Sequence, residues 1–247
     1  MALVVVGTNS VVESEGYDRD TLALPGRQDD LVRAVVAANP AHRGAGQRRG
    51  TGAHAVAGRR RRPADRLVRR PGVRQCGRRR PARGRRAGRR LPTTWPAAEA
   101  DVPVLDCTPV DGVVEYAEGV HIGYRAWLRS GAQPAYWFGS GRGYTSFELT
   151  GVAAPAEAAP GQVVTVTVEV SNTGERDGKE VVQVYAERPD SVVDRPVRWL
   201  VGSAAVRVPA GETARVEVAV PTRYLAYWAD GWQYEPAPTG CASAPRR

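Results

Sequence analysis

The sequence has few cysteines and no long run of apolar residues. Its three cysteines, Cys76, Cys107 and Cys241, are an odd number without the spacing of a metal site, which argues against both a disulfide framework and a zinc site. The opening apolar run, residues 2–6, is too short for the apolar region of a signal peptide and far too short to span a bilayer. We therefore predict no cofactor, no metal and no membrane partner, and a cytoplasmic location.

Acidic and aromatic side chains are almost absent between residues 41 and 90. This window contains 19 arginines, no lysine, no aromatic residue and one acid, Asp65, so its formal charge is +18 in a chain whose total is +9. The rest of the chain is therefore mildly acidic. Because like-charge runs with Gly and Pro and without an apolar period stay solvated, we predict that residues 41–90 are disordered.

The residues before this window predict half of an α/β unit. Residues 2–7, ALVVVG, form a continuous apolar run that ends on glycine, which is typical of a buried parallel strand delivering a loop at its carboxyl end. In residues 27–40, RQDDLVRAVVAANP, leucine and valine recur at helical spacing, and Asn39-Pro40 ends the helix. A second strand should follow within a few residues, but the arginine-rich window stands there instead.

From about residue 148 the pattern changes to short alternating strands. VVTVTVEVSN has valine at every second position from Val164 to Val170, and EVVQVYAE, AAVRV and ARVEVAV repeat the alternation, with glycine-containing turns between them. This spacing predicts an all-β sandwich of roughly 90 residues over 148–235. The tail over 236–247 has no strand pattern.

Several strings resemble glycoside hydrolase family 3, whose commonest members are β-glucosidases, and they occur in the family's order. They are VVVGTNSVVESEGYDRDTLALPGRQDDLV, RLPTTWP, YAEGVHIGYR, FGSGRGYTSFE, VSNTGERDGKEVVQVY, RPVRWLVG and VPAGE. The family's usual plan is an amino-terminal barrel, an α/β sandwich and often a fibronectin type III-like domain, and this chain resembles only the second half of that plan. The resemblance therefore implies a carboxy-terminal fragment whose native amino terminus lies upstream.

On this resemblance, the fold class is an incomplete α/β sandwich followed by an all-β fibronectin type III-like sandwich. Residues 1–147 would be the partial carboxy-terminal α/β domain with a connector, 148–235 the fibronectin type III-like domain, and 236–247 an aberrant tail. Where the family has apolar residues, the window 41–90 has arginines. The genetic code offers an explanation, because codons 42–50 read from the second base permit the apolar strand TVVLVNAG. The tail read from its third base permits GAYRLRVG, so we predict an internal frameshift.

The loop VVESEGYDR is the candidate catalytic segment. Retaining glycosidases use two carboxylates about 5–5.5 Å apart, one as nucleophile and the other as acid/base. The family's nucleophile is an aspartate on the barrel, and the acid/base of its β-glucosidase-like branch is a glutamate in an SGEG-type loop. Matched on EGYDR, that glutamate is Glu15, although Glu13-Ser14 stands where the family often has Ser-Gly. The alternative is that Glu13, Glu15 and Asp18 are solvated loop acids.

Two other groups of side chains have competing interpretations. His121, in GVHIGYR, is at a connector position that favours a structural over a catalytic role. The tryptophans could stack on sugars but are more often core or interface residues; they are Trp95, Trp127, Trp137, Trp199, Trp228 and Trp232. The family often has FGHGL where this chain has FGSGR over 138–142, which leaves the packing of that segment open.

These observations together predict a fragment of a retaining β-glucosidase-like hydrolase that carries the acid/base loop but is inactive without the nucleophile barrel. Its substrate in the intact enzyme would be a β-glucoside or oligosaccharide. One alternative is a non-enzymatic β-sandwich that binds carbohydrate or mediates adhesion. Another is nucleic-acid binding through the arginine-rich window, which would be nonspecific and salt-dependent because the window lacks aromatics and is interrupted by prolines.

Overall fold

A computed structural model describes most of the chain outside the arginine-rich window. The described residues are 2–9, 11–12, 16, 21–39, 42–47, 90–106, 108–141, 143–235 and 240–243. The chain divides into two compact units. The first consists of Met1–Gly84, Pro92–Asp106 and Gly131–Phe138, and the second of Arg85–Leu91, Cys107–Ser130 and Gly139–Arg247.

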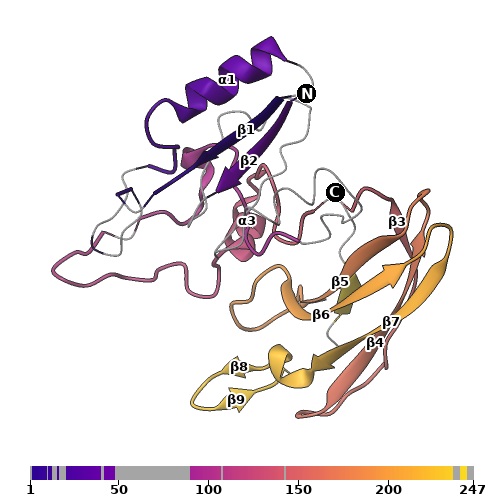
Figure 1. Cartoon of the computed structure of the whole chain (residues 1–247). Coiled ribbons are helices and arrows are strands. Elements are labelled where there is room, and N and C mark those ends of the chain that lie inside the picture. The colour runs from indigo at the N-terminus through magenta and orange to yellow at the C-terminus, as the bar shows by residue number, and fades with distance from the viewer. Residues whose placement is uncertain are drawn as a thin grey trace. The chain divides into compact units, whose positions relative to one another are not determined.

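The first unit contains a parallel strand pair and the helix that connects the two strands. Strand β1 (Ala2–Gly7) pairs with β2 (His42–Gln47) in register from Ala2 opposite His42 to Gly7 opposite Gln47, and α1 (Gln28–Ala38) lies between them in sequence. Figure 1 shows α1 running along the strand pair. The strand predicted over 2–7 and the helix predicted before Asn39-Pro40 are both present.

The small core of this unit lies between β1 and α1. Val4 and Val6 are buried together with Leu24, and Val32 and Val35 of the helix pack against them. On the other face of the strand Val5 is 67% exposed. Because successive side chains of a strand point to opposite faces, only one face of β1 is covered by the described residues.

The prediction of disorder over residues 41–90 is wrong at both ends of the window. Residues 42–47 form β2, and Arg90 is ordered with a guanidinium only 13% exposed. A parallel strand is held through backbone N–H and C=O groups, which every residue except proline supplies in full, so an apolar pattern is not a condition for pairing. Residues 48–89 lie outside the described residues.

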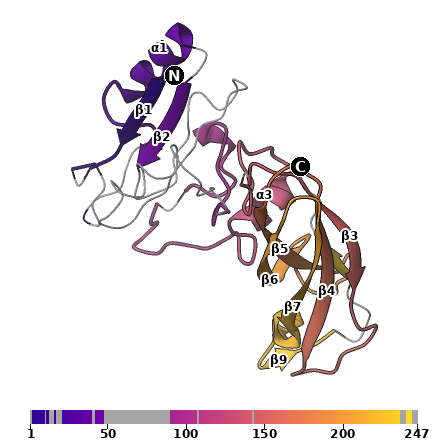
Figure 2. The same cartoon turned by 45° about the vertical axis from the view of Figure 1, so that its right-hand side comes forward.

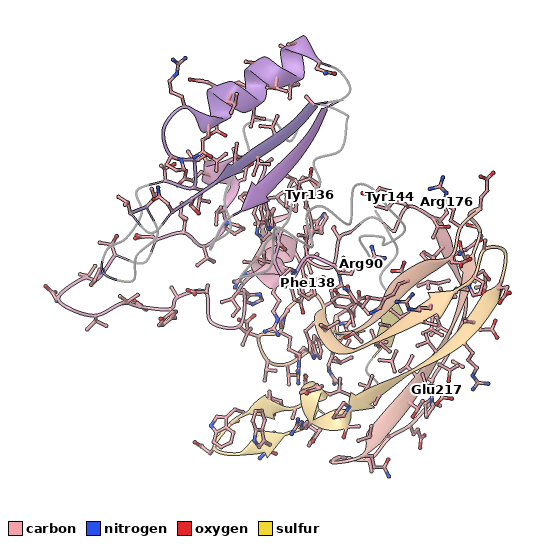
Figure 3. The ribbon with its side chains drawn as sticks, in the orientation of Figure 1. Arg90, Tyr136, Phe138, Tyr144, Arg176 and Glu217 are labelled. Atoms are coloured by element: carbon pink, nitrogen blue, oxygen red, sulfur yellow. The ribbon has the colours of Figure 1, made fainter. Side chains whose placement is uncertain are left out.

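The connector of the first unit is fixed by a short antiparallel bridge. The Trp95 N–H donates to the Tyr136 carbonyl at 2.7 Å, and the Tyr136 N–H donates back at 3.2 Å. The Phe138 N–H donates to Thr94 Oγ1 at 3.2 Å, and a single 3₁₀ turn, η1, spans Glu99–Asp101. Figure 3 labels Tyr136 and Phe138 on this segment. Because Trp95 is 3% exposed, we assign it to the interior.

The second unit is an antiparallel β-sandwich preceded by one short helix, α3 (Tyr124–Ser130). One sheet has the strand order β3-β4-β7 and the other β10-β5-β6, and Figure 2 shows the two sheets as separate layers. The strands are β3 (Phe147–Ala153), β4 (Val163–Asn172), β5 (Gly178–Glu187), β6 (Trp199–Val208), β7 (Thr213–Pro221) and β10 (Gly240–Ser243). After β7 come η2 (Thr222–Leu225), β8 (Tyr227–Trp228) and β9 (Trp232–Gln233).

Alternating valines build the core of the sandwich. Val166, Val168 and Val170 of β4 are at most 1% exposed, and Val184 of β5 and Val218 of β7 belong to the same buried cluster. Burying a side chain of this size contributes about 1.5–3 kcal/mol. The period-2 pattern in the sequence therefore predicted the buried face of β4 correctly.

The tail contains a strand that its sequence pattern does not predict. Strand β10 pairs antiparallel with β5, with Gly240 opposite Glu187 and Ser243 opposite Val184. The outer edge of a strand offers a row of backbone groups that any extended segment can pair with. The backbone, rather than an alternating side-chain pattern, accounts for this strand.

Candidate functional site

The candidate catalytic loop begins where β1 ends. The Gly7 N–H donates to Gln28 Oε1 at 2.7 Å, and Gln28 Nε2 donates to the Gly7 carbonyl at 2.9 Å and to the Pro25 carbonyl at 3.0 Å. The Gln28 side chain therefore joins the two ends of the loop at its base. In open α/β sheets, the carboxyl ends of parallel strands are the usual place for ligand-binding loops.

Two further contacts fix the described flanks of this loop. Asn9 Oδ1 accepts hydrogen bonds from the N–H groups of Val11 and Val12, at 3.0 and 3.2 Å, which makes a local turn after β1. On the return side, the Glu99 carboxylate accepts hydrogen bonds from Thr21 Oγ1 at 2.7 Å and from the Leu22 N–H at 3.0 Å. The loop is therefore attached on both flanks.

Glu15, the predicted acid/base, lies outside the described residues, as do Glu13 and Asp18. Its role therefore stays a prediction, and so does the alternative that these acids are solvated. Gly16, which follows it, is described as an exposed turn residue. Sequence reasoning did not identify Gln28 as the residue that closes the loop, although its place in the first turn of a predicted helix that follows the loop is a usable signal.

His121 connects the connector to the loop between β5 and β6. His121 Nε2 lies 2.8 Å from Asp194 Oδ1; the imidazole is 6% exposed and the carboxylate 69%. The hydrogen bond with His121 lowers the pKa of Asp194; desolvation opposes this effect, and the charges of His121 and Arg129 lower the pKa further. His121 Nδ1 has no hydrogen-bond partner among the described residues. This geometry agrees with the structural role that the sequence favoured.

Glu235 is the most connected carboxylate of the sandwich, and sequence reasoning missed it. Its side chain is 2% exposed; it lies 3.2 Å from Arg188 Nε and accepts a 2.5 Å hydrogen bond from Arg195 Nε. It also accepts hydrogen bonds from the Val192 N–H at 2.9 Å and from Ser191 Oγ at 3.0 Å. Burial alone would raise the pKa of Glu235, but these donors together lower it. The cluster holds the β5–β6 loop in place.

A second buried ion pair fixes the FGSGR segment. Arg90 Nη2 donates to both oxygens of Glu180 at 2.6 Å, and Figure 3 shows Arg90 beside the sandwich. Backbone hydrogen bonds of 2.8 Å join Leu91 to Gly139 and to Ser140. Gly139 has φ +79°, and a Cβ there would collide with the side-chain amide of Gln183. This segment is therefore held by backbone pairing and close approach rather than by a histidine.

The six tryptophans differ in exposure, and Trp137 is half-buried. Trp95, Trp127 and Trp199 are 3–7% exposed, as expected for core residues, whereas Trp228 and Trp232 are 66% and 67% exposed. The prediction of core or interface residues is therefore confirmed for the first three, whereas Trp228 and Trp232 are not core residues.

Neither a metal site nor a membrane-spanning helix is found in the described ranges. In that part of the chain, no group of three or more His, Cys, Asp or Glu side chains could hold a metal ion. No helix described there is long and apolar enough to cross a bilayer.

A domain model and several curated proteins match this chain. Residues 180–240 match the fibronectin type III-like domain. The chain is 32% identical over 259 residues to a β-glucosidase from Rhizobium radiobacter, a match that covers 95% of this chain and 30% of that enzyme. The chain therefore spans about a third or less of the length of the curated relatives it matches.

Solved structures of β-glucosidases also superimpose on this chain. A family 3 β-glucosidase from Bifidobacterium adolescentis superimposes with a TM-score of 0.80 at 27% identity, covering 98% of this chain and 38% of that one. A β-glucosidase from Streptomyces venezuelae, solved in complex with D-glucose, gives a TM-score of 0.78 at 28% identity, covering 98% and 33%. The chain thus belongs to glycoside hydrolase family 3 and corresponds to the carboxy-terminal region of its β-glucosidases, including their fibronectin type III-like domain.

Proposed function

We propose that this chain supplies the acid/base half of a retaining β-glucosidase and has no glycosidase activity alone. The observation that supports this proposal is the anchoring of the described residues on either side of the VVESEGYDR segment. The loop leaves the carboxyl end of β1, and Gln28 and Glu99 anchor its two flanks. In this role Glu15 would protonate the leaving oxygen of the glycosidic bond and then activate the water that completes hydrolysis.

The proposed inactivity follows from the need for a second carboxylate. In a retaining mechanism the nucleophile forms a covalent glycosyl intermediate, and a proton donor cannot replace it. The family resemblance assigns the nucleophile to an aspartate of the barrel, in the part of the relatives that this chain does not span. A β-glucoside or β-linked oligosaccharide is the proposed substrate of the complete enzyme, in keeping with the D-glucose held by the Streptomyces venezuelae relative.

An assay with an aryl β-glucoside tests both parts of this proposal. We expect no release of the aryl alcohol by the chain alone. Co-expression with the amino-terminal part of the Rhizobium radiobacter enzyme is expected to restore turnover, and Glu15→Gln to abolish it. Glu13→Gln is the matched control, since it removes a neighbouring charge and should leave turnover largely unchanged. Turnover by the chain alone that Glu15→Gln removes would refute the proposed inactivity.

We also propose that β1, α1 and β2 are part of the family's α/β sandwich, interrupted by a frameshift. The strand β2, written HRGAGQ, is parallel to β1 and opposite the buried Val4 and Val6. Codons 42–47 read from the second base permit TVVLVN, an apolar run suited to such a position. The coding DNA decides this point, because an intact frame without a compensating single-base change near codons 40 and 90 would contradict the frameshift.

A further inference from the structure

Two tryptophans project from a small hairpin of the second unit. Trp228 on β8 and Trp232 on β9 are direct cross-strand partners, and their rings meet edge to face with centroids 5.4 Å apart and planes at 84°. Each is about two-thirds exposed. Figure 1 shows the hairpin standing out from the sandwich strands. Because indole is a large side chain that is usually buried at least in part, an exposed pair of this kind calls for a ligand.

The opposite face of the hairpin is attached to the sandwich. Arg195 lies over the ring of Tyr227 at 5.6 Å and over Trp199 at 5.1 Å, and its Nη2 donates to the Leu225 carbonyl at 2.9 Å. Tyr227 precedes Trp228 in the strand, so their side chains point to opposite faces. The hairpin therefore has one anchored face and one face that presents both indoles to solvent.

The turn of the hairpin carries one charged side chain and is closed by a backbone hydrogen bond. Ala229, Asp230 and Gly231 connect the strands, and the Ala229 N–H donates to the Gly231 carbonyl at 2.9 Å. Asp230 is exposed and has φ +53°. Its carboxylate can accept hydrogen bonds from hydroxyl groups, and it is the only charge between Tyr227 and Gln233. An acidic tip disfavours a polyanionic ligand, which separates this surface from a nucleic-acid stacking site.

The size of the surface argues against a protein partner. Two aromatic side chains of this kind bury together at most about 300–500 Å², whereas a stable protein interface needs about 800 Å² from each side. A sugar ring matches the smaller area, because its C–H face packs on an indole while its hydroxyls remain available for hydrogen bonds. One or two pyranose rings would cover the pair.

We propose that Trp228 and Trp232 form a saccharide-binding platform on the β-sandwich, with Asp230 accepting hydrogen bonds from the bound sugar. The ligand is a β-linked gluco-oligosaccharide. That choice of sugar rests on the proposed function, whereas the geometry of the platform does not. The platform holds the saccharide but takes no part in its hydrolysis. It would be the first contact of this unit with an extended substrate.

A binding titration of the full chain with cellotetraose tests the platform. We expect saturable binding by calorimetry together with a change in indole fluorescence. Trp228→Ala or Trp232→Ala should weaken binding at least about tenfold, which corresponds to one lost stacking contact of about 1.4 kcal/mol. Trp232→Phe should lose less, because it keeps an aromatic face. Tyr116→Ala is the matched control, since Tyr116 is 77% exposed and lies outside the hairpin.

The possible outcomes are distinct. The platform is refuted if the native chain shows no saturable binding at about 10 mM cellotetraose, or if both alanine variants bind as the native chain does. Loss of self-association in sedimentation, with no sugar binding by the native chain, would assign the hairpin to a second copy instead. Thermal unfolding should be unchanged in all variants, because these side chains are exposed. Restored aryl-glucoside turnover does not depend on the hairpin, so failure of the proposed function and failure of the platform are distinguishable.

Discussion

Thirteen buried residues from five strands form the core of the β-sandwich, whereas three buried residues form the core of the β1–α1–β2 unit among the residues described. In both regions neighbouring strands are paired through the backbone, β1 with β2 and β4 with β7. They differ in the number of side chains buried between their layers. Backbone hydrogen bonds alone contribute little net free energy, because the unfolded chain bonds to water instead. Pairing therefore defines the path of β2, while burial decides how strongly a region is held.

The largest expected effect comes from placing a charge in the core of the sandwich, compared with the same change in the small core. Val168→Asp places an unpaired charge at a site that is 0% exposed, and we expect it to lower the free energy of unfolding of the sandwich by more than about 4 kcal/mol. Val4→Asp makes the same change in the small core. It should leave the unfolding transition of the sandwich unchanged in a urea titration followed by tryptophan fluorescence. An equal loss in both variants would show that the two units unfold together.

The next effect concerns the buried charges of the sandwich. Glu235→Ala leaves the guanidinium groups of Arg188 and Arg195, which are 7% and 8% exposed, without their carboxylate. Removing one partner of a buried ion pair typically costs about 3–5 kcal/mol. We expect a loss of this order in chemical denaturation. A matched control is Glu217→Ala, on the exposed side of β7, which should change stability by less than about 0.5 kcal/mol.

The same carboxylate gives the sandwich a defined pH dependence. The pKa of Glu235 is lowered from 4.5 in the folded state, so folding favours its ionised form. Its contribution is therefore complete above the unfolded value and is lost as the pH falls through the folded value. We expect the native sandwich to lose stability below about pH 4.5. Glu235→Ala should show a shallower loss over the same range, and identical slopes would contradict this assignment.

The sequence predicted the strands in which the pattern of apolar side chains marks the buried face. The alternation from Val164 to Val170 gave the inner face of β4, and the run ALVVVG gave β1. It did not predict β2 or β10, whose pairing uses backbone groups that leave no pattern. It also missed Glu235, because a carboxylate becomes a buried centre only when Arg188 and Arg195 converge on it from a separate loop.

The candidate site divides in the same way. A family string could point to Glu15, since the match on EGYDR is local in the sequence. The hydrogen bonds from the Thr21 hydroxyl and the Leu22 N–H to Glu99 join residues far apart in the chain, and no local sequence pattern predicts them. For Trp228 and Trp232 the sequence favoured a core or interface position over sugar stacking, because tryptophan composition alone does not reveal which face of a hairpin is anchored.

The smallest expected effect shows what holds α1 on the strand pair. Arg33 pairs with Asp30 at 2.9 Å, but both side chains are more than half exposed. Arg33→Ala should therefore reduce the local stability of this unit by at most about 0.5 kcal/mol. Val35→Ala removes a side chain that packs against Val4 and Val6 and should cost about 1 kcal/mol. Hydrogen exchange of the β1 amides reports this local opening. Faster exchange in Arg33→Ala than in Val35→Ala would mean that surface charge, rather than the three-residue core, keeps the helix in place.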